Sequence, residues 1–150
     1  MQSTIKVKLE VLPHGAGLPF PRYQTEGSAG MDLSSAEDVM VARGATKVVA
    51  TGIRMVVPEG YEIQIRSRGG LASKGIFVTN GPGTVDSDYR GEIMVLLTNL
   101  GLEDFYIKRG DRVAQAVTAP VLRAEIDEVD FIDTEETERG EGRFSSTGVA

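Results

Sequence analysis

The segment 80–92 reads Asn80-Gly81-Pro82-Gly83-Thr84-Val85-Asp86-Ser87-Asp88-Tyr89-Arg90-Gly91-Glu92. Its first four residues are typical of a tight turn, because glycine tolerates positive φ and proline holds φ near the value that a turn requires. Phe77 and Val78 lead into this turn, Thr84 and Val85 follow it, and a mainly apolar run extends from 92 to 98. The pattern predicts a β-hairpin that leads into a buried strand.

The polar residues after this turn are more numerous than a purely structural hairpin needs. Turn amides and the Asn80 side chain can pair with the donor and acceptor edge of a planar base, while Tyr89 can pack an apolar face on a sugar. Asp86 is then available as a general base. A purely structural hairpin is the alternative interpretation.

The bulk properties of the chain indicate one globular domain. Its 150 residues can bury a core without disulfides, and none can form, because the sequence has no cysteine. The net charge of −6 argues against nucleic acid as a partner. We find no signal peptide and no long apolar run, so we expect a cytoplasmic protein that does not enter membranes.

Short β-patterned runs separated by glycine or proline predict an all-β fold. The predicted strands cover residues 4–11, 39–42, 47–50, 53–57, 61–65, 92–100 and 112–118. Helical periodicity is scarce, and the best candidate for a helix is 70–74. Residues 12–30 are expected to form a surface loop that carries a solvated His14, and 106–110 to form a turn.

Three polar residues stand at positions where the surrounding pattern does not call for them. Asp32 follows Gly30 between apolar residues, where it either caps a turn or belongs to the outer shell of a metal. Arg68 precedes Gly69-Gly70 and a short helix, an arrangement that suits a phosphate, although a surface arginine at a strand end is the alternative. Gln115 lies among apolar neighbours and needs a hydrogen-bond partner.

Taken together, these segments resemble the trimeric deoxyuridine triphosphate nucleotidohydrolases (dUTPases), whose five short motifs extend over nearly the whole chain. The order and spacing of the five motifs match. The corresponding segments are 29–33, 68–72, 83–92, 109–115 and 139–148.

The resemblance implies a jelly-roll-like β-barrel with one short helix and a flexible C-terminal arm. On that basis, residues 1–135 are expected to form the nucleotide-binding barrel. Residues 136–150 are expected to form a mobile arm that closes the active site of a neighbouring subunit. The resemblance also implies a homotrimer with three active sites, each shared among the subunits.

The resemblance further implies Mg²⁺-dependent hydrolysis of dUTP to dUMP and pyrophosphate by attack of water on the α-phosphorus. Asp86 matches the carboxylate that activates the water, and Asp32 matches the one that holds waters of the magnesium ion. In this reading Asn80 and the backbone near Gly83 and Val85 accept uracil, and Tyr89 packs on the deoxyribose. The remaining substrate-binding positions are Arg68, Gly69, Gly70, Gln115, Arg139, Phe144, Ser146 and Thr147.

The chain departs from the family pattern at several positions. The second motif has Gly69 in place of the usual serine, and Ser67 in place of the proline that usually precedes Arg68. One residue is missing after Lys74, and the fifth motif has Arg143 and Ser145 where glycine is common. Two rival functions therefore stay open, a nucleotide-sensing or protein-binding trimer of the same fold and a relative of the dCTP deaminases.

Overall fold

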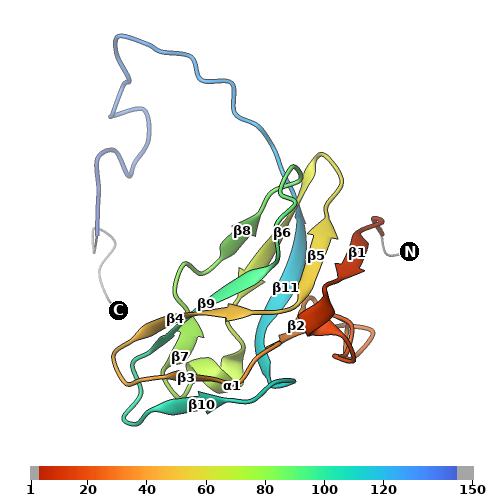
Figure 1. Ribbon diagram of the computed structural model, residues 1–150. Coiled ribbons are helices and arrows are strands. Elements are labelled where there is room, and N and C mark those ends of the chain that lie inside the picture. Colours follow the sequence, from red (N-terminus) through yellow and green to blue (C-terminus); the bar gives the residue numbers. More distant parts are fainter. Residues whose placement is uncertain (1–3, 145–150) are drawn as a thin grey trace.

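The computed structural model describes residues 4–144 and is built almost wholly from β-strands (Figure 1). The strands over this range are β1 (Lys8–Val11), β2 (Met31–Ser34), β3 (Val39–Val41), β4 (Thr46–Ala50), β5 (Ile53–Val56), β6 (Tyr61–Arg66), β7 (Ile76–Val78), β8 (Gly83–Val85), β9 (Met94–Asn99), β10 (Phe105–Ile107) and β11 (Arg112–Pro120). Two short helical elements accompany them, the 3-10 turn η1 (Pro13–Gly15) and the helix α1 (Gly69–Ala72). The expected all-β class with one short α-helix is confirmed.

Over the described range the strands pair into four antiparallel sheets. The largest has the order β2-β11-β6-β8, and a three-stranded sheet has the order β4-β9-β7. The pairs β1-β5 and β10-β3 complete the arrangement. The sheets surround one core without closing into a continuous barrel, which agrees with the expected jelly-roll-like architecture.

The core is formed by branched aliphatic side chains that alternate along the strands. Leu33, Ile63, Val95 and Ile107 are almost completely buried, although they come from four different strands. Burial of each such side chain stabilises the folded state by roughly 1.5–3 kcal/mol. The outward side chains of the same strands are therefore left free for other roles, because successive residues point to opposite faces.

The segment around residue 80 is not the hairpin that its sequence predicts. β7 pairs with β9, whereas β8 pairs with β6, so the strands on the two sides of the turn belong to different sheets. The turn itself is closed by a hydrogen bond from the Gly81 amide to the Val78 carbonyl (3.1 Å), and the Gly81–Pro82 bond is cis. The turn therefore bridges two sheets.

Two other local predictions were wrong, and one of the two alternatives for Asp32 is excluded. Residues 31–34 form β2, so Asp32 lies within a strand and does not cap a turn. Residues 105–107 form β10, and only the following residues turn, with Gly110 at a φ of 94°. The first strand is limited to Lys8–Val11, because only these four residues find a partner, in β5.

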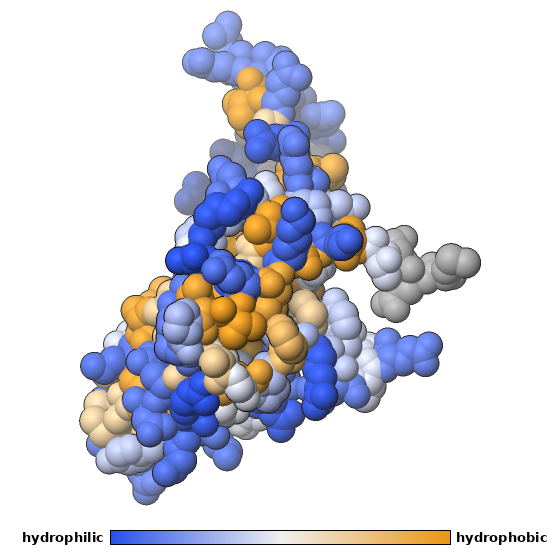
Figure 2. Space-filling model, turned by 45° about the vertical axis from the view of Figure 1, so that its right-hand side comes forward, coloured by the Kyte–Doolittle hydropathy of each residue, from blue (hydrophilic) through white to orange (hydrophobic). Residues whose placement is uncertain are grey.

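The chain leaves the barrel after β11. Residues 121–144 contain neither helix nor strand, and nearly all of them are exposed. Figure 1 shows this extension running away from the sheets, and Figure 2 shows apolar side chains interrupting its polar surface. Leu122, Ile126 and Phe131 are among these exposed apolar residues. Neither helical element within 4–144 is long and apolar enough to cross a bilayer.

A close approach of two glycines fixes the first loop against the barrel. Gly15 in η1 lies on Gly52, and the Leu12 amide donates to the Gly52 carbonyl (2.8 Å). A Cβ atom on Gly52 would lie 2.7 Å from the Gly15 nitrogen, closer than real side chains come. Gly52 also has a φ of 71°, which disfavours any residue with a side chain.

We expect Gly52→Ala to destabilise the protein more than Gly60→Ala does. Gly60 also has a positive φ, 83°, but a Cβ atom there would contact nothing. Both substitutions carry a backbone penalty of roughly 1–2 kcal/mol, and Gly52→Ala adds roughly 1–3 kcal/mol from overpacking. Urea unfolding at one fixed protein concentration measures the difference. Equal losses in the two variants would contradict the close glycine contact.

Candidate functional site

The carboxylate of Asp32 is held between two guanidinium groups. Arg68 donates from Nε to Asp32 Oδ1 (2.9 Å), and Arg112 donates from Nη1 to Asp32 Oδ2 (3.3 Å). The three residues come from β2, from the N-terminal boundary of α1 and from the start of β11. Arg112 lies within the segment 109–115 but was assigned no role from the sequence, so its place beside Asp32 is new information from the structure.

The register of the four-stranded sheet brings Gln115 and Arg66 into line with Asp32. Gln115 on β11 lies directly opposite Asp32 on β2 and opposite Arg66 on β6. Residues directly opposite one another in an antiparallel sheet share a face, so the three side chains form one row on the outer face. Their neighbours along the strands, such as Leu33 and Ala116, face the core instead.

Gln115 has the partner that its sequence position requires. Its Nε2 donates to the carbonyl of Ser67 (2.9 Å). A Cβ atom on Gly30 would overlap Gln115 Oε1, so the glycine leaves room for the amide group. Gln115 and Arg68 are therefore held in the same cluster, since Ser67 and Arg68 are adjacent in the chain.

An open hollow of about 290 Å³ adjoins this cluster. Arg68 and Arg112 line it, together with Leu71, Phe105, Gly110, Asp111 and Val113. Gly69 and Gly70 begin α1 close by, and a Cβ atom on either would contact nothing. Two arginines and Asp111 thus line the hollow, and the two guanidiniums are the groups suited to a small polyanion.

The second group of predicted residues lies on the turn that bridges the sheets. Asn80 is exposed on that turn, and its side-chain amide lies over Gly83, where a Cβ atom would be 3.2 Å from Asn80 Nδ2. Gly83 and Val85 are buried in β8. The absence of a side chain at Gly83 therefore allows the Asn80 amide to lie close to the backbone.

Asp86 and Tyr89 follow directly on β8. Asp86 is exposed, and its carbonyl accepts a hydrogen bond from the Tyr89 amide (3.2 Å). The Tyr89 ring lies against Gly91, where a Cβ atom would overlap it, and its hydroxyl donates to the Glu92 carbonyl (2.8 Å). The residue is 42% exposed, so part of the ring is accessible to a ligand.

Glu92 anchors this segment to the first loop, a role that the sequence did not reveal. Its Oε1 accepts hydrogen bonds from the Gly52 amide (2.8 Å) and from His14 Nε2 (2.7 Å). His14 is thus not simply a solvated loop residue, although about half of its side chain is exposed. The sequence feature that could have indicated this role is the position of the Glu92 carboxylate just before a buried strand.

Asp86, at the far end of the second group, lies well away from Asp32 within one chain. Asp86 and Asp32 are separated by three strand spacings and by about four residues along the strands. Typical sheet dimensions convert this offset to roughly 20 Å between their Cα atoms. A single chain therefore does not bring Asp86 to the arginine cluster.

The predicted arm residues lie apart from both groups. Arg139 is exposed and donates from Nε to the Gly142 carbonyl (3.2 Å), and Phe144 is fully exposed. Ser146 and Thr147 lie outside the described residues. The arm is therefore not seated on the barrel of its own chain at the residues that the structure describes.

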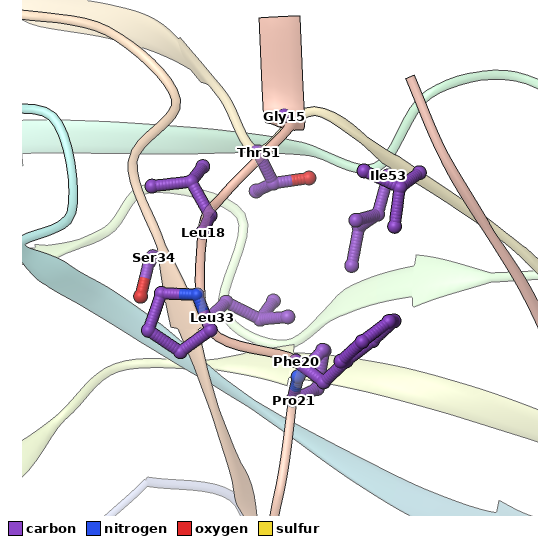
Figure 3. A pocket seen from close by; sticks show the side chains of 10 residues that line it. Gly15, Leu18, Phe20, Pro21, Leu33, Ser34, Thr51 and Ile53 are labelled. Carbon is purple, nitrogen blue, oxygen red and sulfur yellow. The ribbon is translucent and has the colours of Figure 1, made fainter. Parts of the chain in front are cut away.

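A small cavity under the first loop is a poor candidate for a binding site. Figure 3 shows Leu18, Phe20, Leu33 and Ile53 around it. Its volume of about 10 Å³ admits about one water molecule, and its walls are mainly apolar. The candidate functional site consists instead of the arginine cluster and the bridging turn.

The side chains near the hollow fit a metal ion that is held mainly by substrate phosphates and water and by few protein groups. Residues 4–144 contain no group of three or more His, Cys, Asp or Glu side chains that could enclose an ion. Mg²⁺ keeps several waters and is usually bound through one or two carboxylates and substrate phosphates. Asp32, beside the hollow, is a suitable single carboxylate for that mode of binding.

Comparison with known proteins gives consistent results. The sequence model of a family described as dUTPase matches residues 17–148. The deoxyuridine 5'-triphosphate nucleotidohydrolase of Zymomonas mobilis is 55% identical, over 97% of this chain and 100% of the relative. The protein of the same name from Anaplasma marginale is 56% identical, over 97% and 99% of the two chains.

Solved structures agree in fold. The dUTPase of Staphylococcus bacteriophage 80alpha with dUPNHPP has a TM-score of 0.86 at 25% identity, covering 97% of this chain and 100% of the phage chain. The dUTPase from phage phi11 of S. aureus has a TM-score of 0.77 at 22% identity, covering 87% and 99%. At this level the second likeness concerns the fold alone.

We expect Asp32→Asn to strengthen the binding of inorganic pyrophosphate in the absence of metal, by about three- to tenfold. The substitution removes a carboxylate that repels the anion and frees Arg68 and Arg112 to bind it. Isothermal titration calorimetry in the presence of EDTA measures the affinity.

Glu10→Gln is the matched control, because Glu10 Oε2 pairs with Arg54 Nη1 (3.4 Å) on β1 and β5, outside the site. This variant should bind pyrophosphate as the unmodified protein does. Unchanged or weaker binding by Asp32→Asn would show that the two arginines do not form an anion site.

Proposed function

The chain belongs to the dUTPase family, and we propose that it hydrolyses dUTP to dUMP and pyrophosphate in a magnesium-dependent reaction. The observation that carries the proposal is the arrangement of residues 80–92. Along one short segment it presents the exposed amide of Asn80, the exposed carboxylate of Asp86 and the partly exposed ring of Tyr89. The arginine cluster supplies the complementary site for phosphates.

Base recognition is assigned to the bridging turn. Asn80 and the backbone amides and carbonyls near Gly83 and Val85 offer donors and acceptors to the edge of uracil. A cytosine amino group would meet a donor there, and a thymine methyl would meet backbone. The close packing of Asn80 on Gly83 supports this assignment, because it leaves little freedom for the turn to adapt to another base.

Tyr89 is proposed to select the deoxyribose. Its ring rests on Gly91 on one side and its hydroxyl is bound to the Glu92 carbonyl, so the ring has a defined position. A sugar packed on the accessible part of the ring would place C2′ against it. A 2′-hydroxyl in that place would lose its hydration without gaining a partner, which disfavours ribonucleotides.

The chemical step is an in-line displacement at the α-phosphorus. A water molecule held by Asp86 attacks this phosphorus, the bond to the oxygen that bridges the α- and β-phosphates breaks, and pyrophosphate leaves. Asp86 accepts the proton of the attacking water. The exposed position of Asp86 directly after β8 supports this role, since a water can reach it from solvent.

The phosphates are assigned to Arg68, Gln115 and the backbone at Gly69 and Gly70. Arg68 already lies beside Asp32 and the hollow, so it can exchange part of its ion pair for a phosphate oxygen. Asp32 would hold Mg²⁺ through water, and the bound ion would neutralise charge that develops on the phosphates.

A shared site in a homotrimer would bring the two groups together. The separation of roughly 20 Å between Asp86 and Asp32 within one chain supports this proposal, because one nucleotide must contact both groups. The exposed extension supports a further contribution from residues 136–150 to a neighbouring subunit. In that arrangement Phe144 covers uracil, and Arg139, Ser146 and Thr147 contact the phosphates.

We expect the protein to release pyrophosphate and dUMP from dUTP with Mg²⁺, and Asp86→Asn to lower kcat at least about a hundredfold while nucleotide binding is retained. The amide keeps the shape of the side chain but cannot accept the proton. A coupled pyrophosphate assay and calorimetry with a non-hydrolysable dUTP analogue give the two quantities.

Asp88→Asn is the control, because Asp88 is also exposed and lies only two residues away. It should retain nearly full activity. A loss of less than about tenfold in Asp86→Asn, which is about 1.4 kcal/mol of barrier, would rule out Asp86 as the base.

Gly69→Ser is expected to raise kcat/KM for dUTP by about tenfold or more. The family resemblance places a serine hydroxyl near the phosphates at this position, and a hydrogen bond to a charged group contributes about 1.5–3 kcal/mol. The structure has open space for the side chain. Steady-state kinetics of Gly69→Ser and of the control Gly69→Ala separate the effect of the hydroxyl from that of the added Cβ atom. If neither variant gains activity, or both gain equally, the inference that a hydrogen-bond donor is missing at position 69 is contradicted.

A further inference from the structure

Ser67 is the residue that joins the two groups of site residues within one chain. Its hydroxyl oxygen accepts a hydrogen bond from the Val78 amide (2.8 Å), and its carbonyl accepts one from Gln115 Nε2 (2.9 Å). Its chain neighbour is Arg68, which binds Asp32. The strand β6 ends at Arg66, so Ser67 and Gly69 do not share a strand face.

Val78 is the first residue of the turn that carries Asn80. Its carbonyl accepts the hydrogen bond from the Gly81 amide that closes the turn, while its amide is bound to Ser67. Val78 is 97% buried, so water cannot easily replace the serine hydroxyl as the partner of this amide. The position of the turn therefore depends on the Ser67 side chain.

The backbone ladders do not supply the same connection. β7, which leads into the turn, is paired with β9 in the three-stranded sheet, and β8, which leaves it, is paired with β6 in the four-stranded sheet. The Ser67 hydroxyl links the end of β6 directly to β7, across the boundary between these sheets. A proline at this position, as the family pattern has it, could not accept this hydrogen bond.

We propose that Ser67 is a positioning residue that holds the start of the base-binding turn in place through the Val78 amide, and thereby contributes to the selection of uracil. The inference rests on the proposed function for its consequence in catalysis. Its structural basis, the link from Ser67 to Val78, does not depend on the reaction.

The competing role for Ser67 is donation of a hydrogen bond to a phosphate in place of the serine missing at position 69. The structure shows the hydroxyl as an acceptor from the Val78 amide, and its own proton is still available to donate, so kinetics must separate the two roles. The two roles affect different kinetic parameters. Loss of a contact to the base weakens binding and selectivity, whereas loss of a phosphate donor in the transition state lowers kcat.

The test compares Ser67→Ala and Ser67→Thr with the unmodified protein. Ser67→Ala is expected to raise KM for dUTP about three- to tenfold, with kcat changed less than about twofold. The preference for dUTP over dCTP, expressed as the ratio of kcat/KM values, should fall by a similar factor. Ser67→Thr retains the hydroxyl and should restore both quantities to within about twofold.

Ser73→Ala is the matched control. The Ser73 hydroxyl also binds backbone, donating to the Gly70 carbonyl (3.0 Å) just after α1, but it has no contact with the turn. It should therefore leave KM and base preference unchanged. A fall in kcat alone in Ser67→Ala, or equal effects of Ser67→Ala and Ser73→Ala, would overturn the proposal.

A second measurement does not require activity. The Val78 amide should exchange with deuterium at least about tenfold faster in Ser67→Ala than in the unmodified protein or in Ser67→Thr, as measured by NMR. Unchanged exchange would refute the link. If the unmodified protein hydrolysed no dUTP while exchange responded as expected, the proposed function would fail and the positioning of the turn by Ser67 would stand.

Discussion

The pairing of β11 with strands on both sides is the constraint on which the site depends. This strand lies between β2 and β6, and it places Gln115 opposite residues of each. A shift of one residue would move its polar row into the core and its alanines to the outside, so the register is strongly specified. Buried Ala114 and Ala116 therefore determine, from the opposite face, where the polar groups of the site stand.

Opposite charges are paired within the site, although the whole chain is acidic. Arg68 and Arg112 share the carboxylate of Asp32, and this pairing keeps the two guanidiniums beside the hollow. In the proposed reaction, phosphates and a divalent cation would change this pairing together. The cation would compete for the carboxylate and the phosphates for the arginines, so anion and cation would favour each other's binding.

The fold class was predictable, because most of the described strands are recognisable in sequence as alternating apolar and polar residues or as short apolar runs between glycines. Asp32, Arg68 and Gln115 were also noticeable in sequence, since each is a polar residue in a place that requires an explanation. The hairpin around residue 80 was mispredicted, because a turn between two apolar runs looks the same whether its strands pair with each other or with different partners. The hydrogen bond of His14 with Glu92 was missed for a related reason: it joins residues 78 positions apart, and nothing local distinguishes its members.

In the proposed trimer the long exposed extension after Pro120 would act as a tether. Its residues 121–144 carry no ladder of hydrogen bonds that would have to break before the end of the chain moves. A segment held on a flexible tether experiences an effective concentration near its target that can reach the millimolar range. A closing segment delivered in this way would need only weak binding to be in place for much of the time. Weak binding would also allow it to depart quickly, so the same tether that secured closure would keep the site open to rapid exchange of product for substrate.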